Sequence, residues 1–550
     1  MVALHGTDLL AKAKALRHRI ADQAGAKRLE RFHPGSTAAH ALVHGAGLPQ
    51  DLAGEPEAKR PRAVLRITSY RRLPDLVDYQ TTGKEQMLGV IHDGSAAIYS
   101  VPTGAGKTRT VWEAVYDFVA ARAAKRDSPG EEGTRGNRTS AKACNERNVI
   151  VWLAHHNELL DQTCACLKDV WHSRQGNVTA RLVRLWGRNT HDALERLKKL
   201  DPPAWESTSC MVIVSTPATM AAVLDKLDHA PLLRTVLIER TCAIVVDEAH
   251  RAAAPSYVRI AQWLRRPGRA SETDSGETSE RRVALLGLTA TPFRETTSAS
   301  DGTEETLELK KIFGRLLVPG ELGSDPQRML VEQGILARPV FEDLPTGVDV
   351  NIESQVKRFL AKRMKVRGVK SSNVISARGE ELIDRWLAAQ ASAVRSPKRH
   401  SRILEIVLQQ ARDSHARILY FGHSVANAQR MCVSLLEAGI PAGVVSGATR
   451  RGTRRALIED FGAGRIRVLC NCEVLTAGFD APLVTHVVVA RPTVSVVLYQ
   501  QMIGRGLRGP KFGGTERCVI VNCIDRVKIG PLVMAHRRFR DLWERVTDDA

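Results

Sequence analysis

Short, uniformly apolar segments recur along the chain, and longer segments with apolar residues at helical spacing lie between them. Apolar runs of this length indicate strands that are buried on both faces, as in a parallel sheet. Their alternation with helical segments predicts an α/β fold. The expected strands include 96–101, 242–246, 418–421, 443–446, 468–471, 486–490 and 518–522.

Other parts of the chain depart from this pattern. Residues 1–72 predict an N-terminal appendage, helical or partly disordered, because a helical period is followed by Gly- and Pro-rich stretches. A basic, mostly helical segment over 341–412 would be either a plain helical connection or a strand-separating wedge. Residues 529–550 predict a C-terminal helix. The period in the appendage is carried by Leu9, Leu10, Ala13, Leu16 and Ile20.

The segment from Val101 to Thr108, VPTGAGKT, carries the first candidate chemistry. It lies between an expected strand and an expected helix, so backbone N–H groups and the helix N-terminus converge and form an anion site. Gly104 and Gly106 let the backbone approach a phosphate without an intervening Cβ. Lys107 would reach the β and γ phosphates of a nucleoside triphosphate, and the Thr108 hydroxyl would bind Mg²⁺. The segment departs from G-x-x-x-x-G-K-[ST] at Val101.

Two carboxylates follow the expected strand 242–246. Asp247 and Glu248 emerge at its carboxyl end, where open α/β sheets place ligands. Asp247 would hold Mg²⁺, and Glu248 would orient and deprotonate the attacking water. An acidic pair here is also a favourable helix N-cap, which is the plain structural alternative. With the upstream phosphate loop, the pair predicts a nucleoside triphosphatase.

A third segment places two arginines near the end of the chain. Gln501, Arg505 and Arg508 are spaced i, i+4, i+7, so we expect them on one helix face. Two guanidiniums that point to one spot suit a phosphate under attack, as arginine fingers do. Gly504-x-Gly506-x-x-Gly509 also matches the dinucleotide-binding fingerprint. Because it follows no strand and lies in a helical pattern, we reject that interpretation.

The phosphate loop and the DEAH tetrapeptide at 247–250 are two of the motifs by which the chain resembles the superfamily 2 helicases. The resemblance covers residues 73–525. The residues of two motifs, Thr289-Ala290-Thr291-Pro292 and 501–508, are more similar to the corresponding motifs of one DNA-directed group than to those of the RNA-directed groups. This DNA-directed group comprises the type I and type III restriction motors and the RadD-like and XPB-like DNA helicases. DNA is therefore favoured over RNA. Seven further segments occur in the family's order: Tyr79-Gln80, 149–162, 213–217, 287–294, 418–421, 474–482 and 499–508.

The resemblance implies two tandem RecA-like parallel-sheet lobes, at 73–300 and 413–528, with 301–412 as a bridge and basic helical insert. ATP and Mg²⁺ are the expected cofactors. Catalytic roles would fall to Lys107, Glu248, Gln501, Arg505 and Arg508, and metal binding to Thr108 and Asp247. The expected nucleotide-binding residues are Gln80, which would read the adenine, Thr103, Gly104, Ala105, Gly106, Lys107, Thr108, Arg109, His250, Gly478 and Asp480. Contacts to nucleic acid, or coupling to it, would involve His155, Thr216, Thr289, Thr291 and Arg294.

The charge of the chain supports a polyanionic partner. It has 80 Lys and Arg against 60 Asp and Glu, a net charge of +20. Residues 1–72 carry 13 basic and 6 acidic side chains, and residues 351–400 carry 12 and 4. Because this excess of basic side chains is concentrated outside the lobes, it favours additional contacts with nucleic acid. The alternative is a charged surface that contacts only solvent. Four arginines lie within 450–455. They would either line the path of the DNA or lie at the start of a helix that faces solvent.

We therefore expect an ATP-dependent DNA helicase or translocase, in repair, restriction or anti-phage defence, with protein partners in such a complex. The alternatives are an RNA-remodelling helicase and a motor subunit that translocates without unwinding. The sequence shows no secretion signal and no apolar run of membrane-spanning length, so the expected location is the cytoplasm.

Overall fold

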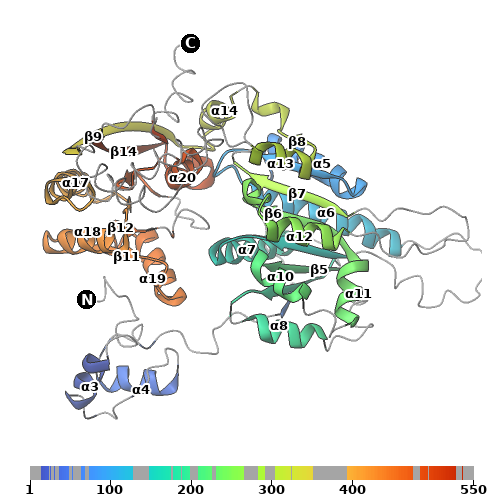
Figure 1. Ribbon diagram of the computed structural model, residues 1–550, viewed down its shortest axis with the longest axis horizontal. Helices are drawn as coiled ribbons and strands as arrows, with labels where there is room; N and C mark the ends of the chain where they lie inside the picture. Colours follow the sequence, from blue (N-terminus) through green and yellow to red (C-terminus); the bar gives the residue numbers. More distant parts are fainter. Residues whose placement is uncertain are drawn as a thin grey trace, which may run out of the picture. The chain divides into compact units, whose positions relative to one another are not determined.

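The computed structural model divides the chain into two compact units, Pro61–Met329 and the combination of Met1–Arg60 with Leu330–Ala550. Figure 1 labels their elements, and each unit is described by itself. The structure describes residues 14–23, 25, 30, 36–46, 48, 53, 64–67, 73–127, 148–174, 178–187, 189–198, 209–225, 231–265, 283–290, 304–323, 325–350, 393–472, 474, 483–493, 495–527 and 535–536.

The unit Pro61–Met329, here the first lobe, contains a sheet whose described strands follow the order β1-β4-β5-β3-β6-β7-β2-β8. Neighbouring strands are parallel, except that β1 at the edge is antiparallel to β4. The strands are β1 Val64–Ile67, β2 Ala96–Ser100, β3 Val149–Leu153, β4 Ala180–Leu185, β5 Cys210–Ser215, β6 Thr241–Asp247, β7 Ala284–Thr289 and β8 Leu316–Leu317.

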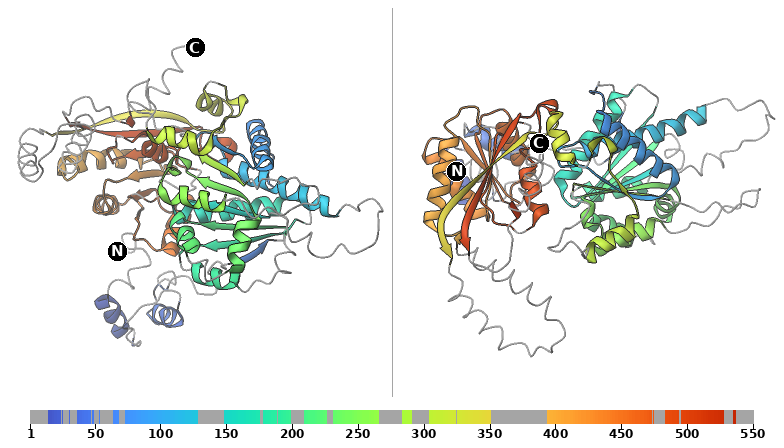
Figure 2. Two further views of the ribbon diagram at one scale, coloured as in Figure 1. Left: turned by 45° about the vertical axis from the view of Figure 1, so that its right-hand side comes forward. Right: turned by 90° about the horizontal axis from the view of Figure 1, so that it is seen from above.

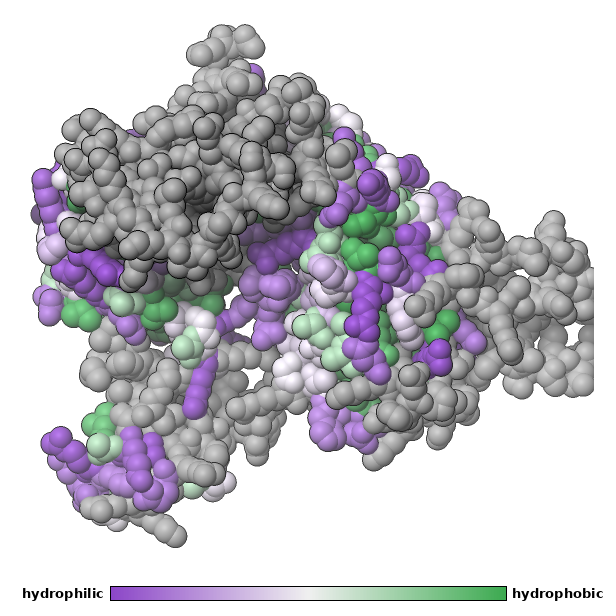
Figure 3. Space-filling model, in the orientation of Figure 1, coloured by the Kyte–Doolittle hydropathy of each residue, from purple (hydrophilic) through white to green (hydrophobic). Residues whose placement is uncertain are grey.

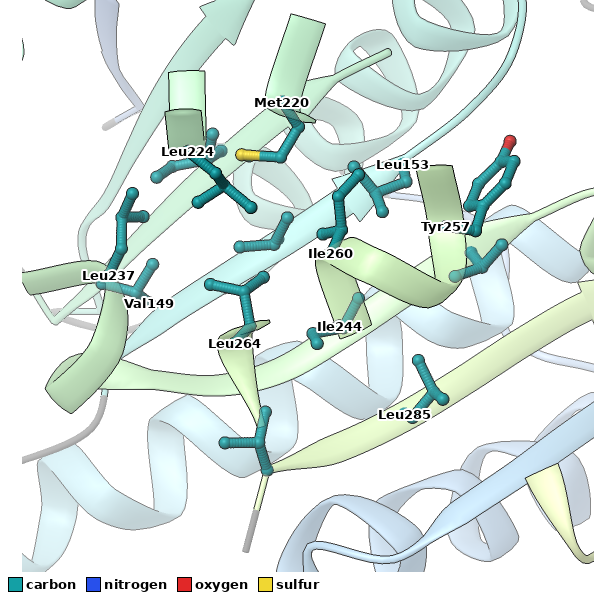
Figure 4. Packing of buried hydrophobic residues seen from close by; sticks show 14 of the residues in the cluster. Val149, Leu153, Met220, Leu224, Leu237, Ile244, Tyr257, Ile260, Leu264 and Leu285 are labelled. Atoms are coloured by element: carbon teal, nitrogen blue, oxygen red, sulfur yellow. The ribbon is translucent and has the colours of Figure 1, made fainter. Parts of the chain in front are cut away.

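Helices cover both faces of this sheet, as the uniformly apolar strands predict. Val149, Val151 and Leu153 of β3 face an apolar cluster that α8, α10, α11, α12 and α13 complete (Figure 4). Trp152 points to the opposite face, where its ring stacks on Trp112 of α6 at 4.6 Å. The helices are α5 Asp78–Asp93, α6 Lys107–Asp127, α7 Asn157–Ser173, α8 Asn189–Lys198, α10 Pro217–Asp225, α11 Pro231–Arg240, α12 Pro255–Leu264 and α13 Glu304–Phe313, with short 3₁₀ helices η6 Ala249–Arg251 and η7 Gly320–Leu322.

The second lobe, within Leu330–Ala550, contains a parallel sheet of described strands in the order β11-β12-β10-β13-β14-β9. Its edge strand β9 and the neighbouring β14 are long and run side by side, as Figure 2 shows. The strands are β9 Arg338–Val350, β10 Ile418–Phe421, β11 Ala442–Val445, β12 Val468–Asn471, β13 His486–Val489 and β14 Arg517–Val527. Except for β9, these positions agree closely with the strands expected from the apolar runs.

Alternate residues of β10 separate the two cores of the second lobe. Ile418 and Tyr420 face a cluster completed by α17 and α18, whereas Leu419 and Phe421 face a cluster completed by α19 and α20. The prediction of two tandem RecA-like lobes is therefore confirmed. The helices are α17 Pro397–Gln410, α18 Val425–Glu437, α19 Arg451–Gly462 and α20 Val496–Ile503, with a short 3₁₀ helix η8 Pro510–Phe512; α14 Pro326–Glu332 spans the division between the units.

The appendage contains two short helices, α3 Lys14–Gln23 and α4 Thr37–Gly45. They share a small apolar cluster that includes Ala21, Ala39 and Leu42. The face of these helices seen in Figure 3 is largely hydrophilic.

Two expected boundaries differ from the structure. Strand β1 lies in the expected appendage but belongs to the sheet of the first lobe, and β9 lies in the expected insert but is an edge strand of the second. Both are edge strands, which need no continuous apolar run; β9 contains Pro339 and Pro345, residues that edge strands tolerate. Residues 351–392, with the question of a wedge, and most of 529–550 lie outside the described residues.

Within the described helices, none combines the length and the apolar character that crossing a membrane requires.

Candidate nucleotide site at the strand ends of the first lobe

The register of the first sheet brings the expected motifs to one edge. Ser100, the last residue of β2, pairs with Thr289, the last of β7, and Asp247 of β6 pairs with Leu288 of β7. Because these strands are parallel neighbours, the phosphate loop, the DEAH segment and Thr289 all lie at their carboxyl ends. This is the edge where open α/β sheets bind ligands.

The phosphate loop has the backbone conformation that its glycines predict. Gly104 and Gly106 adopt φ values of 88° and 80°, in the left-handed region. A Cβ on Gly106 would also collide with the Gln80 amide. The Lys107 ammonium donates to the carbonyls of Val101, at 2.9 Å, and Pro102, at 3.1 Å. The Lys107 ammonium therefore lies across the loop at the N-terminus of α6. Its positive charge adds to the attraction that the backbone N–H groups there would have for an anion.

Two side chains of α5 hold the loop by one carbonyl. The Tyr79 hydroxyl donates to the Ala105 oxygen at 2.8 Å, and the Gln80 side-chain amide donates to the same oxygen at 3.2 Å. The Gln80 side-chain oxygen accepts from the Val77 backbone N–H at 3.3 Å. Gln80 is almost fully buried. Its side chain supports the loop in this structure, and its contact with adenine stays a prediction.

The remaining residues expected to bind nucleotide lie in the loop, at Thr103, or in the first turn of α6. Thr103 and Thr108 are half-buried. Arg109 pairs with Glu113 at 3.4 Å and also donates to the Pro74 carbonyl. The buried Glu113 accepts a further hydrogen bond from Arg174, at 3.0 Å from its Nε. Arg109 thus anchors α6 in this structure, and its nucleotide contact stays a prediction.

The DEAH segment forms a strained turn between β6 and η6. Asp247 is 7% exposed, and one of its carboxylate oxygens accepts from the Glu248 N–H at 3.0 Å. Glu248 has φ 54° and ψ 52°, a left-handed conformation that costs energy for a residue with a side chain and that clusters at functional sites. Its carboxylate lies 3.3 Å from the buried His250 Nδ1. The Glu248 side chain makes no capping hydrogen bond to η6, so the helix-cap alternative for this residue is not observed.

This turn packs directly on the neighbouring strand. A Cβ on Gly287 of β7 would lie 2.8 Å from the Ala249 Cβ and 2.8 Å from the Phe313 ring. Contacts this short do not occur between real side chains, so Gly287 is what allows the turn to approach β7. The position of Glu248 therefore depends on the packing between β6 and β7.

His155 and Thr216 follow β3 and β5, which continue the same edge of the sheet. His155 is exposed, and its ring lies 5.0 Å from that of His156. Burial lowers the pKa of both histidines, and the nearby Arg251 lowers it further, so their neutral forms are favoured. The Thr216 hydroxyl accepts from the Thr219 N–H at 3.2 Å and caps α10. Thr291 and Arg294 lie outside the described residues.

The expectation that Gln501, Arg505 and Arg508 share a helix face is wrong. Helix α20 ends at Ile503, Arg505 lies in the following turn, and Arg508 forms an antiparallel bridge with Leu336. Close packing explains the departure, because a Cβ on Gly506 would lie 2.5 Å from the Cys518 sulfur and one on Gly509 would collide with a backbone carbonyl. The glycines that imitate a dinucleotide fingerprint therefore serve packing.

The second lobe fixes α20 through a buried hydrogen bond. The Tyr499 hydroxyl donates to the Asn522 side-chain oxygen at 2.8 Å, and the Ser495 side chain caps the helix. Among the arginines after β11, Arg454 donates to the Ser446 carbonyl at 3.1 Å and Arg455 pairs with Glu459 at 2.8 Å on an exposed face of α19. These two arginines therefore have structural partners. Gly478 and Asp480 lie outside the described residues.

The first-lobe edge combines an anion cradle, a lysine, a threonine and two carboxylates. This donor set fits a nucleoside triphosphate with Mg²⁺, because Mg²⁺ prefers a few carboxylate or hydroxyl oxygens together with substrate phosphates. Thr108 and Asp247 would hold it, and these two roles stay predictions. The described residues contain no cluster of three or more His, Cys, Asp or Glu side chains that could hold a metal ion by itself. Sequence reasoning named the Tyr79-Gln80 segment but assigned no role to Tyr79, whose hydroxyl holds the loop.

Comparisons with known proteins agree with this arrangement. A family model described as "Type III restriction enzyme, res subunit" matches residues 73–294, and one described as "Helicase conserved C-terminal domain" matches residues 399–509. The first match spans the phosphate loop, the DEAH segment and Thr289. The second spans α17 to the glycine after Arg508.

The chain is also similar to individual proteins and to a solved structure, each over part of its length. It is 24% identical over 311 residues to a "51.5 kDa protein" of Lactococcus phage (isolate 7-9), covering 56% of this chain and 55% of that one. It is 23% identical over 459 residues to the "Putative ATP-dependent helicase IRC3" of Saccharomyces cerevisiae, covering 83% and 52%. The chain thus spans about half the length of these relatives. A solved "ATP-dependent Type ISP restriction-modification enzyme LlaBIII bound to DNA" aligns with TM-score 0.49 and 15% identity, over 84% of this chain and 28% of that one.

The first lobe matches the restriction-enzyme res-subunit model, and the second lobe matches the helicase C-terminal domain model. The chain therefore belongs to the superfamily 2 helicases and is related to the type I and type III restriction motors.

Proposed function

We propose that this protein is an ATP-driven motor that moves on or remodels DNA. The observation that carries the proposal is the register of β6, β7 and β2, which places a phosphate loop, two carboxylates and Thr289 at adjacent strand ends. An ATPase whose catalytic turn lies beside possible nucleic-acid contacts at the ends of β3 and β5 has the means to couple hydrolysis to movement.

The roles of the individual residues are part of the proposal. The loop N–H groups and Lys107 bind the phosphates, and Thr108 and Asp247 hold Mg²⁺, which neutralises phosphate charge. Glu248 orients the attacking water and takes its proton. Arg505 and Arg508 of the second lobe stabilise the charge that develops on the phosphate when the lobes close, so hydrolysis requires movement.

DNA is the proposed track for three reasons. The first lobe matches a restriction-enzyme family, the net charge is +20, and His155 and Thr216 lie at strand ends beside the nucleotide site. Contacts to phosphate groups from such positions carry little sequence information and weaken with salt. We therefore expect binding that tolerates many sequences and decreases steeply as salt rises. Repair, restriction and anti-phage defence are the settings that suit such a motor.

Steady-state ATP hydrolysis tests the proposal. The purified chain is assayed without nucleic acid and with single-stranded DNA, forked DNA or RNA of the same length and sequence. Stimulation by DNA that exceeds stimulation by RNA supports a DNA motor. Stimulation by RNA alone would contradict it and favour an RNA-remodelling helicase.

The variant Lys107→Ala separates hydrolysis from binding of the track. We expect turnover to fall by about 10²-fold, because a phosphate-binding cation is lost, while DNA binding in a fluorescence anisotropy titration changes little. Equal loss of both activities would contradict the assignment of Lys107 to the nucleotide.

Translocation without unwinding would appear as ATP-dependent displacement of a bound protein roadblock but no separation of forked strands, and would identify a motor subunit.

A further inference from the structure

The Tyr257 hydroxyl is buried at the edge of the nucleotide site, and the proposed catalytic roles do not use it. The residue is 4% exposed, and its ring belongs to the apolar cluster on α12. Figure 4 shows the hydroxyl beyond Leu153, pointing away from the aliphatic side chains. Among the described residues, this hydroxyl has no hydrogen-bond partner. Such a group costs about 1–3 kcal/mol, so its presence needs an explanation.

The charged groups that act on this hydroxyl lie in the DEAH segment or directly after it. Burial raises the pKa of Tyr257 well above its ordinary value; the carboxylates of Asp247 and Glu248 raise it further, and the Arg251 guanidinium lowers it in part. Tyr257 is therefore a permanent hydrogen-bond donor at physiological pH. The acceptors whose charges act on it are the two carboxylates assigned to metal binding and water activation.

A short chain of turns fixes Tyr257 relative to Glu248. The Arg251 N–H donates to the Glu248 carbonyl, the Ala254 N–H to the Arg251 carbonyl and the Tyr257 N–H to the Ala254 carbonyl, each at 3.0 Å. Pro255 then begins α12, whose Ile260 and Leu264 are fully buried. A donor on such a rigid element holds its position without further ordering cost.

We propose that Tyr257 is a positioning residue for Glu248. Its hydroxyl donates to the Glu248 carboxylate when that carboxylate turns away from His250 toward the attacking water. The Glu248 side chain is 21% exposed, so it has room to turn, and its carboxylate lies 3.3 Å from His250 Nδ1. The proposal rests on the proposed ATPase function, and it assigns Tyr257 no contact with the nucleotide.

The variant Tyr257→Phe tests this proposal because it removes the hydroxyl alone. We expect kcat for ATP hydrolysis to fall about 10-fold, the lower end of the range for a group that assists proton transfer, while KM for ATP stays within twofold. The thermal midpoint without nucleotide should stay the same or rise, because an unpartnered buried hydroxyl is removed. A hydroxyl with a purely structural role would lower the thermal midpoint or change neither quantity.

Tyr116→Phe is the matched control. Tyr116 is also buried in the first lobe, where its ring lies 5.2 Å from that of Trp171 on the face of α6 and α7. We expect this variant to keep the kcat of the wild type.

The double variant Glu248→Gln with Tyr257→Phe completes the test. Since Tyr257 acts through Glu248, Tyr257→Phe should cause no further loss of the residual hydrolysis in the Glu248→Gln background. A wild-type kcat in Tyr257→Phe, or an additional 10-fold loss in the double variant, would overturn the inference. Wild-type protein without ATPase activity would instead contradict the proposed function, so the two failures are distinguishable.

Discussion

The strand ends of the first lobe and the arginine segment of the second lobe present opposite cases of how a catalytic residue is positioned. In the first lobe, Asp247 and Thr289 are held by the register of neighbouring parallel strands. In the second, Arg505 and Arg508 follow the end of α20, in a turn and an isolated bridge. The register of a sheet fixes the position of each residue in its strands relative to the neighbouring strands. The position of a residue beyond a helix end depends on how the following segment packs.

The difference also lies in what stabilises each region. The first-lobe turn depends on backbone approach at Gly287, with apolar packing beneath it. The second lobe contains two buried polar links away from its arginine segment or next to it: Tyr499 with Asn522 at α20, and Arg399 with Asp525 between α17 and β14. The two lobes should therefore be sensitive to different substitutions, and the following variants test this difference.

Loss of the arginine that follows α20 should have the largest effect on catalysis. Arg505→Ala removes a guanidinium assigned to the developing phosphate charge, and we expect a decrease of about 10³-fold in kcat. Thermal unfolding should change little, because the residue is only half-buried. The measurement is DNA-stimulated ATP hydrolysis at saturating ATP, with Arg465→Ala as the control.

Arg465 is exposed and pairs with Asp460 on the same lobe, so its removal should leave kcat unchanged. If Arg505→Ala also kept wild-type kcat, the arginine segment would have no part in hydrolysis, and the comparison between the two regions would lose its functional meaning.

Breaking the buried ion pair should have the largest effect on stability. Arg399 and Asp525 are 2.8 Å apart with side chains 1% and 2% exposed, and Arg399 also donates to the Ala490 carbonyl at the end of β13. Burial alone would lower the Arg399 pKa, but the Asp525 carboxylate reverses this and raises it. Arg399→Ala leaves a buried carboxylate without its cation, so we expect a loss of about 3–5 kcal/mol in the free energy of unfolding, measured with urea.

The double variant Arg399→Met with Asp525→Leu sharpens this test. Because it removes both charges and keeps apolar volume, most of the lost stability should return. A double variant as unstable as Arg399→Ala would mean that packing, and not the charge pair, holds α17 on β14.

Crowding of the first-lobe turn should have a smaller effect. Gly287→Ala places a Cβ 2.8 Å from Ala249 and Phe313, and overpacking of this kind costs about 1–3 kcal/mol. Displacement of the turn should also lower kcat. The control is Gly89→Ala in α5, where a Cβ meets no atom within 4 Å and helix propensity favours alanine. Equal stability of the two variants would show that the turn has more room than its packing indicates.

The sequence predicted the first-lobe site well because its chemistry lies where apolar runs end. An apolar strand must be buried, and its carboxyl end must meet those of its parallel neighbours, so Lys107 and Asp247 can be placed from the sequence pattern. Thr289 is placed instead by the resemblance to the superfamily 2 helicases. The Gly-rich loop likewise requires positive φ values, which Gly104 and Gly106 adopt.

Other features depend on tertiary contacts that spacing does not encode. The helical period through Arg505 and Arg508 continues in the sequence, but α20 ends at Ile503, and Gly506 beyond its end lies too close to Cys518 to carry a side chain. The edge strands β1 and β9 lack the uniform apolar run of a central strand, so they were assigned to flanking segments. The hydrogen bond from the Gln80 side chain to the Ala105 carbonyl joins residues 25 positions apart, and the burial of Tyr257 depends on an apolar cluster that several strands and helices complete.

The most direct test of the central claim is DNA-stimulated ATP hydrolysis by Glu248→Gln beside the wild type, at saturating ATP and Mg²⁺. The account predicts that the wild type hydrolyses ATP faster with DNA, and that the variant binds both ATP and DNA but turns over about 10³-fold more slowly, because the group that activates water is gone. Equal hydrolysis by the two proteins would contradict the assignment of the strand-end carboxylate, and with it the account of the first lobe as the catalytic site.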